Sequence, residues 1–350
     1  MKFIETCGAI AKMLSAVLLA CAMPSAPAFA QTAGKEIGEI NLAQQFGAIF
    51  LPLMVMENQK LIEKQTAAAG LGEVKVNWAK VAGPSVMVEM IISGQMHFTA
   101  QGVPSLAILW DKTRGTGGSG IGVKGVSAIT NTDIFLNTRN SKITSIRDFT
   151  DTDRIAVPSV KVTTQALFLQ IAAEKEWGPG QHTRLDHLTV SLAHPDALAA
   201  VMNPAGEITA HFATSPFHEA EMKAGLKTVT TGYKIMGGEV TNLVFATTEK
   251  FRSANPKTYA AVIAALDEAI GWVNADKRRA AKLYIAMTNE KKLTEDDVTQ
   301  IISTPGFDFT KTPKKTFAFA EFMHRIGTLK SKPESWKDLY FPEAHGEKGD

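Results

Sequence analysis

The sequence predicts an α/β protein with two lobes, because one pattern occurs twice at positions more than a hundred residues apart. The pattern is a strand, a turn ending in proline, a helix, a glycine, a second strand and a closing proline. It runs from Val74 to Pro104 and again from Leu188 to Pro216. Each copy is typical of a βαβ unit, whose strands are parallel and whose crossover is right-handed. Ligands of such units gather at the carboxyl ends of strands beside helix N-termini, so two units predict two halves of a binding cleft.

The remaining elements follow from periodicity and from turn residues. The expected elements before and between the copies are a strand Ile37–Leu42, a turn Gln44–Gly47, a helix Phe50–Gln65, a helix Ser105–Trp110, a strand Val123–Thr130, an extended segment Asn131–Asn137, a helical turn Ser145–Phe149, a strand Arg154–Val157 and a helix Gln165–Glu174. Thr163 or Thr164 is the expected N-cap of the last of these helices. The segment Gly115–Gly122 resembles a dinucleotide-binding motif, but it follows a helix and precedes a strand, which indicates a connecting loop.

The chain after the second copy is expected to begin with two strands and then to be helical. The strands are Leu226–Val229 and Val240–Thr247. Four helices follow: the first runs from Asn255-Pro256 to Trp272, the second covers Asp276–Met287, the third begins at the capping pattern Thr294-x-x-Asp297, and the fourth runs from Thr312-Pro313 to Gly327. Their apolar faces are expected to pack against the first lobe.

The first thirty residues are typical of a secretory signal peptide. Lys2 and Lys12 precede the apolar run Met13–Met23, which is much shorter than the roughly 20 residues needed to span a membrane. Ala28-Phe29-Ala30 then forms a cleavage site of small residues. Acylation of Cys21 in a lipoprotein signal is the alternative. The segment predicts export to the periplasm.

Composition excludes several functional classes. Both cysteines, Cys7 and Cys21, lie in the predicted signal peptide, so the mature chain has no thiol nucleophile, disulfide or thiolate metal site. The mature chain carries 35 basic and 34 acidic residues, a balance that does not favour nucleic acid as a partner. The eight histidines are scattered, and no Gly-x-Ser-x-Gly or His-Glu-x-x-His motif is present. We therefore expect no catalytic residues, no metal and no cofactor.

Three segments together resemble one protein family. They are Ala82-Gly83-Pro84 before an amphipathic helix, Gly94–Phe98 with Gly102 and Pro104, and the segment Phe135–Ala156 with its Ser-x-Ile pattern. In order and spacing they are similar to the periplasmic binding proteins of ABC importers for nitrate, taurine and alkanesulfonates, a group related to thiamine-pyrimidine-binding proteins. The resemblance covers about residues 37–275.

The resemblance implies a type II periplasmic-binding-protein fold with two hinge crossovers, near Ile129–Asp133 and Glu239–Leu243. It implies a first lobe from residues 31–131 and 241–350, with the helical tail packed on it, and a second lobe from 132–240. The implied function is capture of a small solute, with an anion favoured, in the cleft and delivery to an ABC permease and its ATPase, by a monomer. Alternatives are a sensor component that feeds a signalling receptor, or an enzyme related to thiamine-pyrimidine synthesis on the same fold.

The sequence departs from the family pattern where ligands bind. His97 stands where the family usually has an aspartate, and Val103 replaces the acidic residue of the family's Gly-Asp turn. Ile208 stands where an acidic residue commonly follows the glycine of the second copy. Thr214-Ser215-Pro216 replaces a turn that usually carries an aromatic residue, unless Phe217 substitutes for it. These departures leave the identity of the solute open.

The candidate ligand-binding residues lie in loops at strand ends and at helix N-termini, where unpaired N–H groups and partial positive charge suit an anion. They are Gln45, Phe46, Gly83, Pro84, Ser85, Gln101, Lys161, Thr163, Thr164, His194, Ser215, Glu239 and Asn242. Structural roles compete at several positions, since Ser85, Thr163 and Thr164 are also candidate N-caps. His97 and His211 lie within strands and are expected to be structural.

Overall fold

The computed structural model describes residues 36–115 and 120–350. The expected signal peptide (residues 1–30) and the alternative acylation of Cys21 lie outside the described residues. So do the central residues of the glycine-rich loop.

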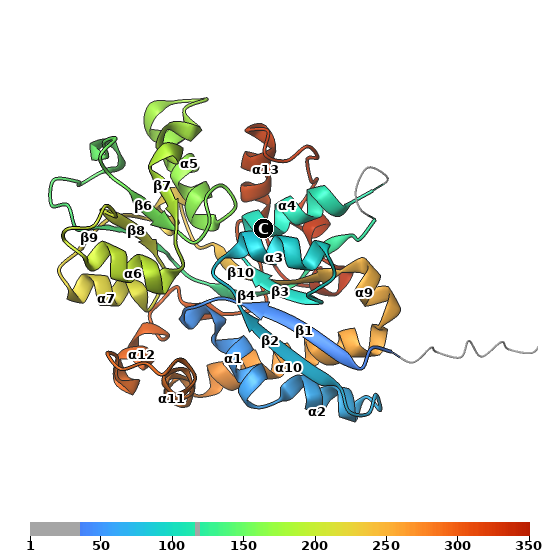
Figure 1. Ribbon diagram of the computed structural model, residues 1–350. Coiled ribbons are helices and arrows are strands. Elements are labelled where there is room, and N and C mark those ends of the chain that lie inside the picture. The colour runs from blue at the N-terminus through green and yellow to red at the C-terminus, as the bar shows by residue number, and fades with distance from the viewer. Residues whose placement is uncertain (1–35, 116–119) are drawn as a thin grey trace, which may run out of the picture. The chain divides into compact units, whose positions relative to one another are not determined.

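The first of two mixed sheets has the strand order β11-β4-β10-β3-β1-β2. Its strands are β1 (Glu39–Gln44), β2 (Lys75–Lys80), β3 (Phe98–Gln101), β4 (Val123–Asn131), β10 (Thr241–Thr248) and β11 (Asp308–Phe309). Strands β2 and β3 both pair in parallel with β1, and β10 runs antiparallel to β3 and β4. Helices α3 and α4 lie on one side of this sheet and α1, α2 and α10 on the other (Figure 1).

The second sheet has the order β7-β6-β8-β5-β9 and repeats the plan of the first. Its strands are β5 (Phe135–Thr138), β6 (Ile155–Val157), β7 (Thr189–Ser191), β8 (Ala210–Ala213) and β9 (Lys227–Thr231). Here β7 and β8 both pair in parallel with β6, and β5 runs antiparallel to β8 and β9. The two repeat copies therefore have parallel strands, as the sequence predicts, and in each copy a third parallel strand lies between them.

The helices link these strands in the alternating order expected of an α/β protein. They are α1 (Leu51–Asn58), α2 (Leu61–Ala68), α3 (Pro84–Ile92), α4 (Val103–Thr113), α5 (Thr164–Trp177), α6 (His194–Met202), α7 (Phe217–Lys223), α8 (Gly232–Met236), α9 (Glu249–Ala254), α10 (Pro256–Ala275), α11 (Lys277–Thr288), α12 (Glu295–Ile301) and α13 (Thr316–Arg325). A 3₁₀ turn, η1 (Ala48–Phe50), precedes α1.

Two crossings join the sheets, one between β4 and β5 and the other between α8 and β10. Where they pass, Thr241 Oγ1 donates a hydrogen bond of 2.8 Å to Asn131 Oδ1. The carboxylate of Asp133 accepts hydrogen bonds from the backbone amides of Ile134 (2.9 Å) and Tyr233 (2.8 Å). The crossings, residues 132–134 and 237–240, overlap the two segments expected to be hinges, which gives the two-lobed plan of the type II fold. The lobe boundaries at 131/132 and 240/241 stay predictions, as does motion about the crossings.

Several local predictions were wrong. The helix expected over Phe50–Gln65 is divided into α1 and α2 at Lys60, whose φ of 51° is left-handed. The chain after Lys250 is not wholly helical, because β11 pairs with the edge strand β4. The last helix begins at Thr316 rather than at Thr312-Pro313, after Lys315 with a φ of 55°.

The hydrophobic core has two main parts. One part fills the space between the first sheet and helices α1, α2, α10 and α11. The other extends from α4 and α13 into α5 and the second sheet. Phe319 of α13 packs against Phe168 of α5 with ring centroids 5.5 Å apart, and Arg325 forms a salt bridge with Glu174 of α5 at 2.5 Å. The helical tail therefore contacts the second lobe as well as the first.

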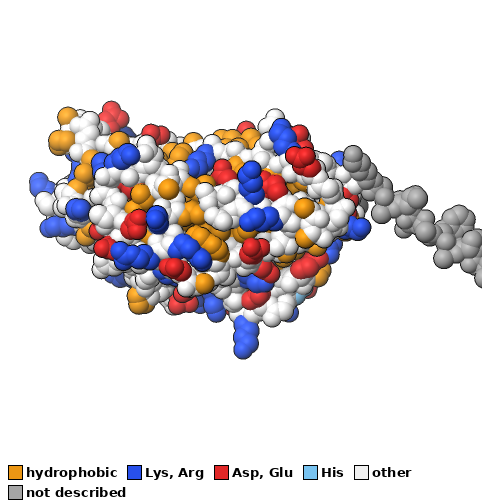
Figure 2. Space-filling model, turned by 90° about the horizontal axis from the view of Figure 1, so that it is seen from below, with side chains coloured by type: hydrophobic (Ala, Val, Ile, Leu, Met, Phe, Trp, Pro, Cys, Tyr) orange, Lys and Arg blue, Asp and Glu red, His pale blue; other side chains and the backbone are white. Residues whose placement is uncertain are grey.

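The face shown in Figure 2 carries lysine and arginine side chains interspersed with aspartate and glutamate. Basic side chains do not dominate this face, in keeping with the near-neutral composition. Within residues 36–115 and 120–350, no helix has the length and apolar character that a membrane span requires.

One exposed position in α10 offers a test of helix energetics. Gly271 lies inside this helix, and a Cβ added there meets no atom within 4 Å. Because alanine costs less backbone entropy than glycine in a helix, Gly271→Ala is expected to raise the free energy of unfolding by about 0.8–1 kcal/mol. Urea unfolding followed by circular dichroism measures the change, and an unchanged or lower midpoint would contradict it.

Candidate functional site

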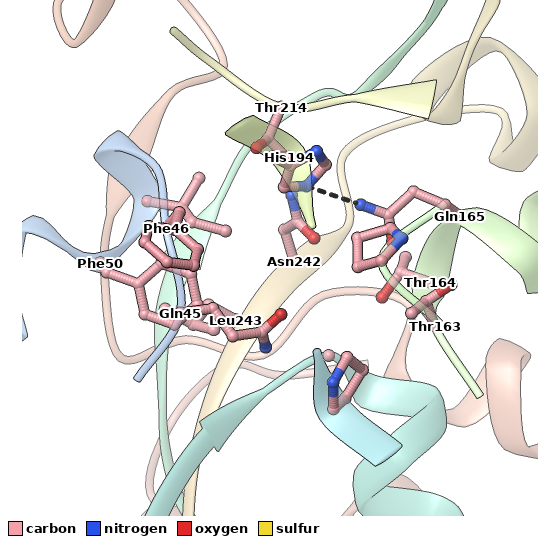
Figure 3. Close-up of a pocket in the computed structure, with 14 residues that line it drawn as sticks. Gln45, Phe46, Phe50, Thr163, Thr164, Gln165, His194, Thr214, Asn242 and Leu243 are labelled. Carbon is pink, nitrogen blue, oxygen red and sulfur yellow. Dashed lines mark hydrogen bonds between the residues drawn. The ribbon is translucent and has the colours of Figure 1, made fainter. Parts of the chain in front are cut away.

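A cavity of about 30 Å³ lies between the two sheets. Residues next to both sheets line this cavity, as Figure 3 shows. The lining residues are Gln45, Phe46, Ile49, Phe50, Pro84, Gly102, Asn242 and Leu243 of the first lobe, and Pro158, Thr163, Thr164, Gln165, His194 and Thr214 of the second. A single water needs about 10–15 Å³ by this measure, so the cavity holds only a few non-hydrogen atoms.

The cavity is built at the carboxyl ends of parallel strands. Gln45 directly follows β1 and Gly102 follows β3, while Pro158 follows β6 and Thr214 follows β8. This is the edge of an α/β sheet where ligands bind, because the loops there diverge. Both repeat copies thus contribute to one site, as the sequence predicts.

Helix N-termini also meet at the cavity. The lining residues Pro84, Thr164 and His194 are the first residues of α3, α5 and α6, and Gly102 is the N-cap of α4. Four helices of at least nine residues therefore begin at this cavity. Their dipoles place partial positive charge there, which favours a negatively charged group.

Three lining side chains carry buried polar atoms without any hydrogen-bond partner. These atoms are Thr164 Oγ1, Thr214 Oγ1 and Asn242 Nδ2, and their residues are 2%, 1% and 5% exposed. A buried polar group that stays unpaired costs about 1–3 kcal/mol. Groups of this kind gathered around one cavity indicate a polar solute that would pair with them.

The two lobes touch directly around the cavity. The backbone amide of Ala48 donates to the carbonyl oxygen of Ser215 at 3.0 Å. Ser105 Oγ donates to the carbonyl oxygen of Val162 at 2.7 Å. These contacts join opposite lobes, so the structure shows the cleft closed.

His194 is the only titratable residue among the described lining residues. Its Nδ1 lies 2.8 Å from Nε2 of His211, and Nδ1 of His211 lies 2.5 Å from Oε1 of Glu221. On the cavity side, Nε2 of His194 lies 3.5 Å from Nε2 of Gln165 (Figure 3). Burial lowers the pKa of His194 well below its ordinary value and the pKa of His211 to about 3, and it raises the pKa of Glu221 to about 8.

The candidates from the sequence divide into two groups. Those that line the cavity are Gln45, Phe46, Pro84, Thr163, Thr164, His194 and Asn242. Those that do not are Gly83, Ser85, Gln101, Lys161, Ser215 and Glu239.

Several of the non-lining candidates have other surroundings. Ser85 is exposed and does not cap α3, whose N-cap is Gly83. Lys161 and Glu239 are also exposed, so neither adds its charge to the cavity. Ser215 Oγ donates to Glu219 Oε1 at 2.7 Å. Gln101 is fully buried next to Gly102, and neither of its amide atoms has a partner.

Among the lining candidates, Thr163 has a structural role. Its hydroxyl accepts from the backbone amide of Ala166 (3.1 Å) and donates to the carbonyl oxygen of Ser159 (2.9 Å), so it is the N-cap of α5. The hydroxyl of Thr164 is the free one.

Sequence reasoning missed half of the lining residues. They are Ile49, Phe50, Gly102, Pro158, Gln165, Thr214 and Leu243. Gln165 and Thr214 adjoin the candidates Thr164 and Ser215, so a wider window at each strand end would have included them. Phe217 does not line the cavity; it stacks on His194 with ring centroids 5.3 Å apart.

Of the two histidines expected within strands, His97 directly precedes β3 and is partly buried, and His211 lies in β8. Nδ1 of His97 accepts from the backbone amide of Asn41 at 3.0 Å, a structural role as expected. His211 is completely buried, but its two ring nitrogens contact His194 and Glu221 rather than backbone. Within the described residues, no three histidine, cysteine, aspartate or glutamate side chains are grouped so as to hold a metal ion.

The fold is shared with solved binding proteins at low sequence identity. The alkanesulfonate-binding protein SsuA of Xanthomonas axonopodis pv. citri, solved with bound MOPS, has a TM-score of 0.65 and 15% identity, over 85% of this chain and 96% of that chain. The aliphatic sulphonate-binding protein SsuA of Escherichia coli has a TM-score of 0.61 and 15% identity, over 87% and 99%.

The periplasmic nitrate-binding protein NrtA of Synechocystis PCC 6803 has a TM-score of 0.66 and 14% identity, over 87% of this chain and 85% of that chain. No family model matches the sequence, and no curated protein is significantly similar to it. The structural likeness shows a periplasmic-binding-protein fold, the fold that the sequence resemblance implies.

Proposed function

We propose that this protein is an extracytoplasmic solute-binding protein that holds a small anion in its interlobe cavity and delivers it to an ABC permease and its ATPase. The observation that carries the proposal is the cavity itself. Four helices begin at it, and three buried polar side chains face it without partners. The fold shared with sulfonate-binding and nitrate-binding proteins supports the same role.

The chemistry of the cavity favours a small anion over a cation or a large apolar molecule. No carboxylate lines it among the described residues, and helix N-termini supply partial positive charge. Hydroxyl and amide groups suit oxygen atoms of a nitrate, carboxylate or sulfonate group. The closed volume of about 30 Å³ favours a solute of a few atoms, or the head group of a larger one that holds the cleft further open.

Binding without catalysis is part of the proposal. The lining residues include no serine or cysteine nucleophile, and the one histidine contacts another histidine rather than a nucleophile. A sensor that passes the same binding signal to a receptor is the alternative, and gene neighbours that encode a permease and an ATPase would distinguish the importer.

A thermal-shift screen tests the proposal. The panel contains nitrate, formate, acetate, methanesulfonate and taurine, with ammonium chloride as a cationic control. An anion at 100 times its Kd is expected to add about 2.7 kcal/mol to the free energy of unfolding, which raises Tm. Recovery of the anion unchanged after incubation would support binding over turnover. Absence of a shift with every anion at 10 mM would count against the proposal.

Adjacent threonines provide a matched pair of variants. Thr164→Val removes a hydroxyl that has no protein partner, so it is expected to leave stability unchanged and to weaken anion binding about tenfold or more. Thr163→Val removes the N-cap of α5 and is expected to cost about 1 kcal/mol of stability. Calorimetric titration and urea unfolding of both variants measure the effects. Equal affinity of Thr164→Val and the unmodified protein would exclude this hydroxyl from the site.

A further inference from the structure

A chain of three buried side chains leads from the cavity into the second lobe. His194 is 6% exposed, and His211 and Glu221 are fully buried. The contacts are His194 Nδ1 to His211 Nε2 at 2.8 Å and His211 Nδ1 to Glu221 Oε1 at 2.5 Å. The three residues come from α6, β8 and α7, so the folded second lobe brings them together.

The number of protons on this chain decides which atom faces the solute. If Glu221 is ionised and both imidazoles are neutral, His211 Nδ1–H donates to the carboxylate. Nε2 of His211 must then accept from His194 Nδ1–H, which leaves Nε2 of His194 without a proton.

One additional proton reverses each of these bonds. Whether Glu221 or His211 holds that proton, Nε2–H of His211 donates to Nδ1 of His194. Nε2 of His194 then carries a hydrogen and is a donor toward the cavity. The amide nitrogen of Gln165, which lies 3.5 Å from Nε2 and is itself a donor, must then turn away and present its oxygen or leave the place to an oxygen of the solute. The result does not depend on the position of the proton between Glu221 and His211.

The surroundings of Glu221 favour the state with the additional proton. Its other oxygen, Oε2, accepts from Asn137 Nδ2 at 2.7 Å, and Asn137 Oδ1 accepts from Thr228 Oγ1 at 2.8 Å. In the described parts of the chain, neither lysine nor arginine hydrogen-bonds to any member of the chain of three. Burial therefore raises the pKa of Glu221 to about 8, which keeps an uncharged chain near pH 7.

Two other, partly buried titratable groups lie close by on α7. His218 Nδ1 is 3.0 Å from Asn137 Nδ2, and burial lowers the pKa of His218 to about 4, so it is neutral at pH 7. Burial raises the pKa of Glu219, and the charge of Glu221 adds to that rise. Strands β5 and β6 have no titratable side chain. The remaining charged residues of the neighbouring α6, α7 and β9 are exposed, namely Asp196, Lys223 and Lys227.

We propose that His194, His211 and Glu221 form a proton relay that makes Nε2 of His194 a hydrogen-bond donor to the bound anion, so that anion binding is linked to one proton on the relay. The inference deepens the proposed function and depends on an anion in the cavity. His194 is the residue that contacts the solute, and His211 and Glu221 are positioning residues. The relay supplies an imidazole N–H donor to a cavity whose described lining residues include neither lysine nor arginine.

The proposal predicts the pH dependence of binding. Below pH about 8 the free relay already carries the proton, so the affinity is constant. Above that pH the free protein has lost the proton and must regain it when the anion binds. The affinity then falls by up to tenfold per pH unit, until the bound form also loses the proton.

Glu221→Gln tests this dependence. Asn137 Nδ2 donates toward the position of Oε2, so the oxygen of the new amide is expected there and its NH₂ group faces His211 Nδ1. That orientation keeps Nε2–H on His194 at every pH. The anion that gives the largest thermal shift with the unmodified protein serves as probe, with nitrate first. At pH 7 the variant is expected to bind it within about threefold of the unmodified affinity, and its affinity is expected to stay constant up to pH 9.5.

Calorimetry in two buffers with different ionisation enthalpies counts the protons taken up. The unmodified protein is expected to take up about one proton per anion at pH 9 and none at pH 6.5, and Glu221→Gln none at either pH. Glu219→Gln is the matched control, because it removes another carboxyl group from the same helix. That carboxyl group accepts a hydrogen bond from Ser215 and does not contact the relay. It is expected to retain the proton uptake. No uptake at pH 9 by the unmodified protein, or uptake retained in Glu221→Gln, overturns the proposal.

Nitrogen NMR of the imidazole rings tests the relay without a ligand. Between pH 6.5 and 9.5, His194 and His211 are both expected to change from the Nε2–H to the Nδ1–H tautomer, and this change is expected to be absent from Glu221→Gln. Fixed tautomers in the unmodified protein would overturn the relay even if an anion binds. A tautomer change without any anion binding would instead count against the proposed function.

Discussion

Replacing Gly83 with alanine is expected to weaken anion binding by about 100-fold while both lobes stay folded. A Cβ at this position would lie 2.5 Å from the carbonyl oxygen of Pro158 and 2.5 Å from Ser159 Oγ, both in the opposite lobe. Gly83 has extended backbone angles that alanine also adopts, so the clash exists only when the cleft is closed. Overpacking of this kind costs about 1–3 kcal/mol, and the upper end of that range corresponds to about 100-fold in affinity.

Gly102→Ala is expected to have the same effect from another loop. Its Cβ would lie 2.3 Å from Thr164 Oγ1, and its φ of −69° suits alanine. Gly38→Ala is the matched control, since a Cβ there meets no atom within 4 Å. Calorimetry measures the affinity, and small-angle scattering with and without the anion measures closure. If Gly83→Ala binds the anion as tightly as the unmodified protein, the closed contacts of this structure are not those of the bound form.

Phe319→Ala is expected to lower the free energy of unfolding by about 3–5 kcal/mol, the usual cost of removing a buried phenylalanine. Phe319 is fully buried in α13, where its ring packs against Phe168 of α5 in the second lobe. The substitution leaves a cavity in the core that α4, α5 and α13 share. Loss of this contact therefore affects the packing of the tail against both lobes.

Phe317→Ala on the same helix is the control, because Phe317 is only partly buried and a smaller loss is expected. Urea unfolding followed by circular dichroism compares the two variants with the unmodified protein. Phe319→Leu is expected to recover part of the stability by filling most of the cavity. A loss below 1 kcal/mol for Phe319→Ala would show that the tail does not contribute to holding the second lobe.

The proposed relay adds a specificity element that the helix N-termini alone do not provide. Helix dipoles attract any small anion, whereas a donor at Nε2 of His194 requires an acceptor at one place. If the relay operates as proposed, the protein binds anions most tightly below pH about 8 and releases them more easily above it.

The sequence by itself determined the elements whose signals are local. Turn prolines and glycines mark strand ends, and Thr163 before an apolar run marks the start of α5. The repeated pattern showed two βαβ units, and the order of three segments indicated the fold. Export rests on residues 1–30 and stays a prediction. Local signals failed at Lys60 and Lys315, where two non-glycine residues adopt left-handed angles and interrupt expected helices.

Only the tertiary structure decided which side chains meet. Thr164 and Asn242 come from opposite lobes and face one cavity, whereas Ser85 in the first turn of α3 and Lys161 in the loop before α5 face solvent. His211 looks like an ordinary strand histidine in the sequence, and its contacts with His194 and Glu221 depend on how α6 and α7 pack against β8. Sequence patterns report on neighbours within a few residues, but hydrogen bonds and burial at this site depend on distances between segments, which the order of strands and the closure of the lobes determine.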